Sequence, residues 1–108
     1  MQMTIDGGQG NQPRLLDQVR MRIHRLGLSR RTEKVYVGWV KRYIRFHRMQ
    51  HPKDLGKVHI EAFLSDLALH GKVSPATQNQ ALSALLFLYK QVLNQEMPWV
   101  DDVRRAKP

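Results

Sequence analysis

The sequence predicts an all-α domain of four helices. Apolar residues recur at spacings of three and four in four separate segments, and each segment is bounded by a capping residue, a glycine or a proline. No stretch shows the alternating pattern of a strand. The chain has 108 residues, of which 42% are hydrophobic, enough for one core in a small helical bundle. Connections of about three to nine residues favour two antiparallel helix hairpins.

The two ends of the chain differ from this helical part. Residues 1–12 are polar, contain three glycines and show no periodicity, so we expect a disordered leader or a cloning remnant there. The four-helix domain is predicted to span residues 13–97. Residues 98–108 begin after the expected last helix and are interpreted as the start of a linker.

The first predicted helix runs from about Pro13 to Leu26. Proline suits the first turn of a helix, because its missing N–H would have no partner there. Gly27 is the residue type that most easily takes the left-handed conformation after a helix end. The apolar residues that share one face of this helix are Leu15, Leu16, Val19, Ile23 and Leu26.

The second predicted helix runs from about Arg30 to Arg48. Ser29 is a good N-cap, since its hydroxyl can accept a hydrogen bond from a free backbone N–H. The sequence His51-Pro52, followed by Gly56, is expected to break the helix. The residues that cluster on its core-facing side are Val35, Tyr36, Trp39, Val40, Tyr43, Phe46 and His47.

The third and fourth helices complete the predicted bundle. The third runs from about Val58 to His70 and is ended by Gly71. The fourth opens at Ser74-Pro75, an N-cap followed by proline, and continues to about Asn94. The inward residues of the third are Ile60, Phe63, Leu64 and Leu67, and those of the fourth are Leu82, Leu85, Leu86, Tyr89, Val92 and Leu93.

Positive charge is concentrated in one third of the chain. Between Arg14 and Arg48 there are eleven Lys and Arg residues against two acids, Asp17 and Glu33. The rest of the chain carries seven residues of each sign, so this stretch accounts for the whole net charge of +9. Such a concentration on two consecutive helices is typical of a polyanion-binding face. We therefore expect nucleic acid as the partner.

The second helix carries the clearest basic stripe. Its cations gather within about 80° opposite the apolar side, with Gly38 in their middle. A glycine inside a helix costs about 1 kcal/mol relative to alanine, so it could serve close approach of a phosphate backbone or simply pack against a neighbour. The alternative is an ordinary solvent-exposed helix face, although such faces usually carry both positive and negative side chains. The stripe consists of Arg30, Lys34, Lys41, Arg45 and Arg48, with Arg31 and Arg42 beside it.

The fourth helix offers a second, uncharged surface. Asn and Gln side chains can pair with adenine in a major groove, and Ser can contact base edges or phosphate. Thr77 stands at the helix start, where hydroxyls and free N–H groups favour phosphate oxygens. An ordinary polar face is the alternative. Phe87 falls toward this side of the helix. It would there be either a contact between subunits or a residue packed under the first helix. The polar face comprises Ala76, Asn79, Gln80, Ser83 and Lys90.

Several classes of site are not expected. The chain has no cysteine, which excludes disulfides and thiolate metal sites. His47 and His51 have the spacing of a helical metal pair, but Pro52 makes a shared geometry unfavourable. Asp66 and His70 fit a helix-surface pair better than a catalytic dyad. We predict no metal, no cofactor and no catalytic residue, and no apolar run is long enough to span a bilayer.

Two stretches of the sequence resemble a known family. The pattern Ser29-x-Arg31-Thr32-Glu33-x-x-Tyr36-x-x-Trp39, with Ile44-x-Phe46-His47, resembles the second helix of the N-terminal core-binding domain of tyrosine recombinases. Thr77-Gln78-Asn79-Gln80-Ala81-Leu82-Ser83-Ala84-Leu85-Leu86-Phe87-Leu88-Tyr89 resembles the integron integrases within that family. His51-Pro52, Leu55-Gly56, Ile60-Glu61-x-Phe63-Leu64 and the opening Leu15-Leu16-Asp17-Gln18-Val19-Arg20 match as well. The resemblance covers roughly residues 14–107.

The resemblance implies a four-helix, SAM-like domain that forms half of a clamp on DNA, with the second and fourth helices facing the duplex. The implied substrates are integron recombination sites, either duplex or folded single strands, during cassette integration and excision in the bacterial cytoplasm. The implied partners are protomers of a recombinase assembly and the catalytic domain of the same parent. The phosphotyrosine chemistry would belong to that domain, so Tyr36, Tyr43 and Tyr89 are not expected to be nucleophiles. The linker at residues 98–108 would lead to that catalytic domain.

Residue by residue, we expect two kinds of DNA contact. Arg30, Arg31, Lys34, Lys41 and Arg45 would hold phosphates, with Thr32 beside them at the helix start. Thr77, Asn79, Gln80 and Ser83 would approach the backbone or base edges. A helical self-association module, using Phe87 and Met97-Pro98-Trp99-Val100, is the alternative. A free-standing helix-turn-helix repressor fits less well, because no tight turn between recognition helices is visible.

Overall fold

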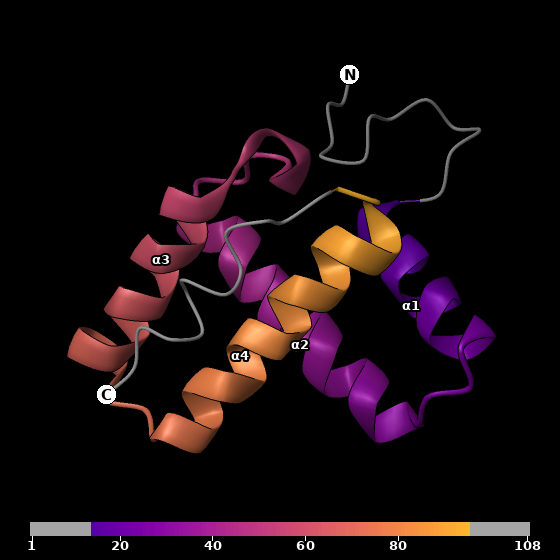
Figure 1. Ribbon diagram of the computed structural model, residues 1–108, viewed down its shortest axis with the longest axis horizontal. Helices are drawn as coiled ribbons and strands as arrows, with labels where there is room; N and C mark the ends of the chain where they lie inside the picture. The colour runs from indigo at the N-terminus through magenta and orange to yellow at the C-terminus, as the bar shows by residue number, and fades with distance from the viewer. Residues whose placement is uncertain (1–13, 96–108) are drawn as a thin grey trace.

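In a computed structural model of the chain, residues 14–95 are described, and they contain helices and no strand. Four α-helices run in alternating directions, so that consecutive helices form two antiparallel hairpins (Figure 1). The predicted all-α, four-helix fold is therefore confirmed. The predicted leader and linker, together with Pro13 and Met97-Pro98-Trp99-Val100, lie outside the described residues. The α-helices are α1 (Leu15–Arg25), α2 (Arg30–Phe46), α3 (Lys57–Asp66) and α4 (Pro75–Phe87), and the shorter helical turns are η1 (Pro52–Asp54), η2 (Leu67–Gly71) and η3 (Leu88–Val92).

Helix α1 ends as the sequence predicts. Gly27 has a φ of +74°, and its N–H donates to the His24 carbonyl at 3.0 Å while that of Leu28 donates to the Ile23 carbonyl at 3.0 Å. These two bonds form a Schellman motif, which satisfies carbonyls that the helix leaves free. Leu26 was expected in the core but is 45% exposed, because it is the C-cap and lies beyond the last core-facing turn.

Helix α2 begins as predicted and ends two residues earlier. The Ser29 Oγ accepts a hydrogen bond from the Thr32 N–H. At the other end, Arg48 and Met49 have φ values of 57° and 66°, and the Met49 N–H donates to the Ile44 carbonyl at 2.8 Å. The helix is thus ended by a left-handed turn of non-glycine residues, four residues before Pro52. Neither residue type would suggest this conformation.

Helix α3 widens into the π-turn η2 at its C-terminal end. The sequence predicts that Gly71 ends this helix, and the helical turn does end there. Lys72 has the positive φ, at 50°, while Gly71 is still part of the turn. Helix α4 continues into η3 in the same way, and Asn94 ends it with a φ of 54°. Its N-cap, Ser74, and the following Pro75 are confirmed.

One hydrophobic core joins all four helices. Most predicted core residues are buried, but Phe46 is 38% exposed; its ring lies against Phe63 at the edge of the core, with centroids 5.5 Å apart. Periodicity also missed several buried positions, because α2 and α4 contact neighbours on more than one side. The buried residues of α2, α4 and η3 outside the predicted stripes are Val37, Ile44, Ala81, Ala84 and Leu88.

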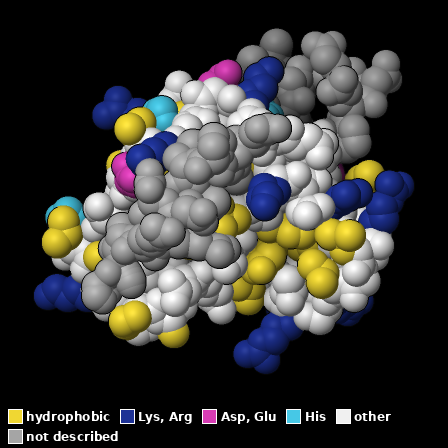
Figure 2. Space-filling view, viewed as in Figure 1, with side chains coloured by type: hydrophobic (Ala, Val, Ile, Leu, Met, Phe, Trp, Pro, Cys, Tyr) yellow, Lys and Arg dark blue, Asp and Glu magenta, His cyan; other side chains and the backbone are white. Residues whose placement is uncertain are grey.

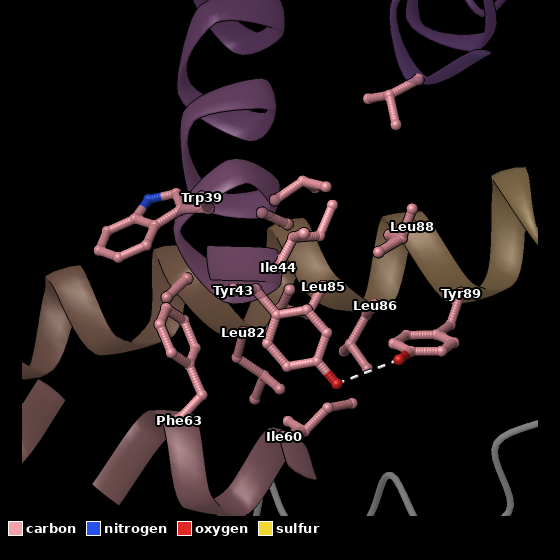
Figure 3. Close-up of a cluster of buried hydrophobic side chains, with 14 of the residues drawn as sticks. Trp39, Tyr43, Ile44, Ile60, Phe63, Leu82, Leu85, Leu86, Leu88 and Tyr89 are labelled. Atoms are coloured by element: carbon pink, nitrogen blue, oxygen red, sulfur yellow. Dashed lines mark hydrogen bonds between the residues drawn. The ribbon is translucent and has the colours of Figure 1, made fainter. Parts of the chain in front are cut away.

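Two buried tyrosines connect three elements through hydrogen bonds. Tyr43 of α2 and Tyr89 of η3 have exposed fractions of 0% and 1%, and their hydroxyl oxygens are 3.0 Å apart (Figure 3). The Tyr89 hydroxyl donates to the Pro52 carbonyl at 2.7 Å. Since that hydroxyl has one proton, Tyr43 is the donor in the bond between the two tyrosines. Burial raises the pKa of Tyr89 to about 12.

Helices α2 and α4 cross near the centre of the molecule and contact each other (Figure 1). Their N-terminal ends lie along the same edge, the lower one in Figure 1. α1 packs on α2 and η3, and α3 packs on α4. The fold therefore brings the two helices that carry the predicted contact residues together and aligns their N-termini.

The turn between α2 and α3 contains an acid-sensitive cap. The His51 Nδ1 accepts a hydrogen bond from the Lys53 N–H at 3.1 Å, which requires an unprotonated Nδ1. Burial, followed by the charge of Lys53, lowers the pKa of His51 below its ordinary value of 6.5. A lowered histidine pKa means that the stabilising contribution is present above pH 6.5 and is lost as pH falls through the folded-state pKa.

We therefore expect wild-type stability to fall between roughly pH 7 and pH 5 by more than that of His51→Asn, whose amide oxygen can accept the same bond without titrating. Thermal unfolding of both proteins over this range measures the difference. Parallel pH profiles for the two proteins would contradict the role assigned to His51.

Candidate nucleic-acid interface

The basic stripe of α2 is exposed and electrostatically uncompensated. Within residues 14–95, none of its cations forms an ion pair, and all of them are exposed. The stripe residues that the structure places on α2 are Arg30, Arg31, Lys34, Lys41, Arg42 and Arg45. A row of cations without carboxylates beside it repels itself, so a polyanion would relieve that repulsion.

The two acids of this region lie toward α1 and not in the stripe. Glu33 is 2.8 Å from the His24 Nε2 and 3.7 Å from the Arg20 Nε. The Asp17 Oδ1 is 2.9 Å from the Arg20 Nη1. Both carboxylates are thus occupied by cations of the first helix.

Gly38 lies in the middle of the stripe, with open space beside it. A Cβ built on this residue would meet nothing within 4 Å among its neighbours. Among residues 14–95, the possibility that the missing side chain of Gly38 makes room for a neighbour is therefore wrong. The missing side chain leaves a smooth strip of helix backbone between Lys34, Lys41 and Arg45, and an extended polyanion could lie close to it.

Arg48 does not belong to the stripe, although periodicity had placed it there. Helix α2 ends at Phe46, and the left-handed conformation of Arg48 turns the chain away from the helical path. The structure therefore shortens the stripe at its C-terminal end to Arg45.

The N-termini of α2 and α4, which lie on the shared edge, are capped by the same arrangement of a serine and a threonine. Ser29 caps Thr32 in α2 and Ser74 caps Thr77 in α4, with N–H to Oγ distances of 3.0 and 3.1 Å. In each pair the serine hydroxyl also donates to the threonine Oγ1, at 3.1 Å. The Thr77 N–H was expected to be free for an anion, but its serine cap already occupies it. The threonine hydroxyl protons remain as donors.

The polar face of α4 adjoins the stripe. Asn79, Gln80 and Ser83 are exposed, as predicted. The Trp39 Nε1 donates to the Gln80 Oε1 at 3.3 Å, linking α2 to α4. The Arg42 guanidinium lies over the Trp39 ring, 4.7 Å from its centroid. Through these contacts Arg42, beside the stripe, is linked to Gln80 of the polar face.

Phe87 packs within the molecule. Its ring lies 5.4 Å from that of Tyr36, centroid to centroid, and it is partly buried against the core. The ring contact places Phe87 against α2. The packing gives Phe87 a role within the fold.

An open hollow lies on another side of the molecule, between α1 and η3. It has a volume of about 610 Å³. Arg22 lies in it, with one terminal nitrogen donating to the Gln91 Oε1 at 3.3 Å and with a buried Nε that has no partner. Figure 2 shows Lys and Arg side chains at several points around the outline of one face and hydrophobic side chains gathered between α1 and α4. Glu33 also lines the hollow, which makes it less basic than the stripe.

The histidines are used structurally. The His47 Nε2 is 2.9 Å from the His59 carbonyl oxygen, and the Asp66–His70 contact of 2.8 Å is an exposed helix pair, as expected. Among residues 14–95, no group of three or more His, Cys, Asp or Glu is arranged to hold a metal ion. No helix in the same range has the length and apolar character needed to cross a bilayer.

Comparison with known proteins identifies the domain. The family model described as "Phage integrase, N-terminal SAM-like domain" matches residues 15–99, which include all four helices. The chain belongs to this family.

Two relatives of this integrase-type SAM-like domain are each named "Integrase/recombinase", one from Escherichia coli and one from Pseudomonas aeruginosa. Each is 50% identical to the chain over 95 residues, which is 88% of the chain. The chain spans 28% of the length of these relatives. The match thus covers one domain of a longer recombinase-type protein in both cases.

Sequence reasoning missed the contacts that Trp39 and Arg42 of the SAM-like domain make beside the polar face of α4. Trp39 was assigned only to the core, because its ring is apolar and falls on the buried side. Arg42 was placed beside the stripe without a partner. Their spacing of three residues puts them on neighbouring turns of a helix, so the cation–π contact was detectable. The bond from Trp39 to Gln80 was not, because it joins residues 41 positions apart.

Proposed function

We propose that this domain binds recombination-site DNA as one half of a clamp in an integron-type integrase. The observation that carries the proposal is the uncompensated stripe of α2, which adjoins the polar face of α4 and shares an edge with both helix N-termini. Arg30, Arg31, Lys34, Lys41 and Arg45 would neutralise phosphates. The Thr32 and Thr77 hydroxyls would add contacts at the helix starts, while Asn79, Gln80 and Ser83 would face the backbone or base edges.

Strand cleavage and transfer would then belong to another domain of a longer, bacterial and cytoplasmic parent protein. The names of the two relatives support a recombinase parent. The environment of the tyrosines supports a non-catalytic role for this domain, because a nucleophilic hydroxyl must be accessible and activated. Tyr43 and Tyr89 are buried with raised pKa values, and Tyr36 packs on Phe87.

The proposed substrates are integron recombination sites, as duplexes or as folded single strands. Contacts to phosphate suit both forms, because the stripe needs only a backbone of regular charge spacing. The proposed partners on that DNA are further protomers of the recombinase and the catalytic domain of the same parent chain.

The direct test is salt-titrated DNA binding by Lys41→Ala and Arg45→Ala. Each variant should bind more weakly to every sequence, and the slope of log K against log salt should fall by about one unit per lost phosphate contact. Fluorescence anisotropy with a hairpin cassette site, its linear duplex and a scrambled duplex measures both quantities. The same titration shows which DNA form binds most tightly.

Lys53→Ala is a matched control. Lys53 is exposed and lies on η1, outside the stripe, so its loss removes one charge without removing a proposed contact. Its slope should stay close to that of the wild type. If both stripe variants keep the affinity and slope of the wild type, the stripe is not the DNA contact.

A further inference from the structure

The Gln80 amide has a defined orientation, which a surface glutamine normally lacks. An indole N–H is a hydrogen-bond donor and never an acceptor. Because the Trp39 Nε1 lies 3.3 Å from the Gln80 side chain, the atom facing it must be the amide oxygen and not the amide nitrogen. The two atoms of a side-chain amide are otherwise hard to distinguish, but here the chemistry of the partner decides.

Trp39 is itself held in place. Its exposed fraction is 7%, its ring lies edge-on to Phe63 with centroids 6.4 Å apart, and the Arg42 guanidinium covers it at 4.7 Å. The indole N–H therefore has a fixed position at the junction of α2 and α4. A bond from a fixed donor restrains Gln80 even though Gln80 is exposed.

The amide nitrogen is left for a ligand. Within residues 14–95 the Gln80 Nε2 has no hydrogen-bond partner, and the side chain is exposed on the polar face. We propose that Trp39 fixes Gln80 as a hydrogen-bond donor toward the DNA, so that Gln80 selects guanine at one position of the contacted duplex. This inference rests on the proposed DNA-binding function and adds a base preference to it.

The base preference follows from the acceptors in the major groove. Guanine presents two acceptors there, N7 and O6, which suit the two protons of one amide nitrogen, whereas cytosine presents a donor. Adenine presents N7 beside a donor, so a full pair with adenine needs the amide oxygen as well. In this domain the Trp39 N–H occupies one of the two lone pairs of the oxygen and holds the oxygen toward α2. The orientation thus favours guanine over adenine and disfavours cytosine most.

Asn79 provides a contrast on the same face. It is exposed like Gln80, and no hydrogen bond fixes its amide among the described residues. Its oxygen and nitrogen are both available, so it can rotate to suit either purine. Asn79 has the same chemistry without a fixed orientation, so no preference between the purines is expected from it.

The experiment is selection from a library of randomised DNA duplexes by the wild-type chain and three variants. The wild type should enrich guanine over adenine at one position by about tenfold. Gln80→Ala should lose the preference at that position. Trp39→Phe, which keeps an aromatic ring but lacks the N–H, should reduce it to less than about threefold, because the amide can then rotate. Lys53→Ala, which lies outside the proposed interface, should keep it.

A second measurement separates base contact from altered folding. In the selected duplex, 7-deazaguanine at the preferred position removes the N7 acceptor, and it should weaken the wild type but not Gln80→Ala. Circular dichroism of Trp39→Phe verifies that the helices are retained. If Trp39→Phe loses helicity, the Gln80→Ala and 7-deazaguanine results still decide whether Gln80 contacts the base.

The outcomes distinguish this inference from the proposed function. Binding by the wild type that depends on salt and on Lys41, but enriches no guanine or keeps its preference in Gln80→Ala, would overturn the inference and leave the proposed function standing. An unchanged guanine preference in a folded Trp39→Phe would overturn the positioning role of Trp39. No binding by the wild type to any duplex at low salt would overturn both proposals.

Discussion

Replacing Tyr89 by phenylalanine is expected to lower the free energy of unfolding by about 2–4 kcal/mol, whereas Tyr43→Phe should cost about 1 kcal/mol. The two residues form one hydrogen-bonded chain but occupy different places in it. Tyr89 donates to the Pro52 carbonyl and accepts from Tyr43. Its loss removes the bond to the Pro52 carbonyl, which keeps only the Leu55 N–H as a donor, and leaves the buried Tyr43 hydroxyl without a partner. Loss of the Tyr43 hydroxyl leaves the bond to Pro52 intact.

Urea unfolding of both single variants and of the double variant measures these energies. The double variant should be no less stable than Tyr89→Phe alone, since the orphaned Tyr43 hydroxyl is then absent as well. The two substitutions should therefore be non-additive, as expected for residues in one network. Equal costs for the two single variants, or strictly additive ones, would contradict the donor order assigned to this chain.

Replacing Gly38 by leucine is expected to change stability and DNA binding in opposite directions. Leucine is a much better helix former, so the free energy of unfolding should rise by close to 1 kcal/mol, because nothing lies within 4 Å of the new Cβ. The side chain would stand between the cations of the stripe and hold the DNA backbone away. A lost charge-assisted contact costs about 1.5–3 kcal/mol, which is roughly a tenfold to hundredfold loss of affinity.

Gly38→Ala is the graded control for this prediction. It gains a similar amount of helix stability but adds only a methyl group, so its affinity should lie between those of the wild type and Gly38→Leu. Thermal unfolding and fluorescence anisotropy at constant salt measure the two effects. Wild-type affinity in Gly38→Leu would show that the DNA does not approach the helix at this residue.

The fold could be predicted from the sequence because its signals are local. Ser29, Gly27 and the Ser74-Pro75 pair mark helix ends through the chemistry of neighbouring residues, and all of these are confirmed. The end of α2 was placed less well. Arg48 and Lys72 take left-handed conformations that their side chains do not favour, and the N–H groups of the residues that follow them, Met49 and Val73, donate back to carbonyls of the preceding helix.

The core was predicted only in part, because contacts between helices, which helical periodicity does not describe, also decide which residues are buried. A helical stripe identifies the residues that face one neighbour, but α2 contacts both α1 and α4. Val37 and Ile44, on the flank of the predicted stripe, are therefore buried as well. Phe46 is exposed although it lies on the predicted core-facing side. It stands at the end of the helix, where little of the molecule remains to cover it.

The candidate site shows where sequence reasoning stops. Exposure of Lys41, Arg45 and Asn79 follows from helix periodicity alone. The absence of ion pairs along the stripe depends on where Glu33 points, and the orientation of Gln80 depends on a residue of another helix. Both are tertiary facts that no local pattern encodes.

The pairing of Glu33 with His24 and Arg20 also has a kinetic consequence. By drawing the Glu33 carboxylate toward α1, it leaves the cations of the α2 stripe as uncompensated positive charge on one side of the described residues. In the field of a polyanion such a molecule experiences a torque before any contact is made. We therefore expect it to approach with α2 leading, and its association rate should fall as added salt shortens the range of that field.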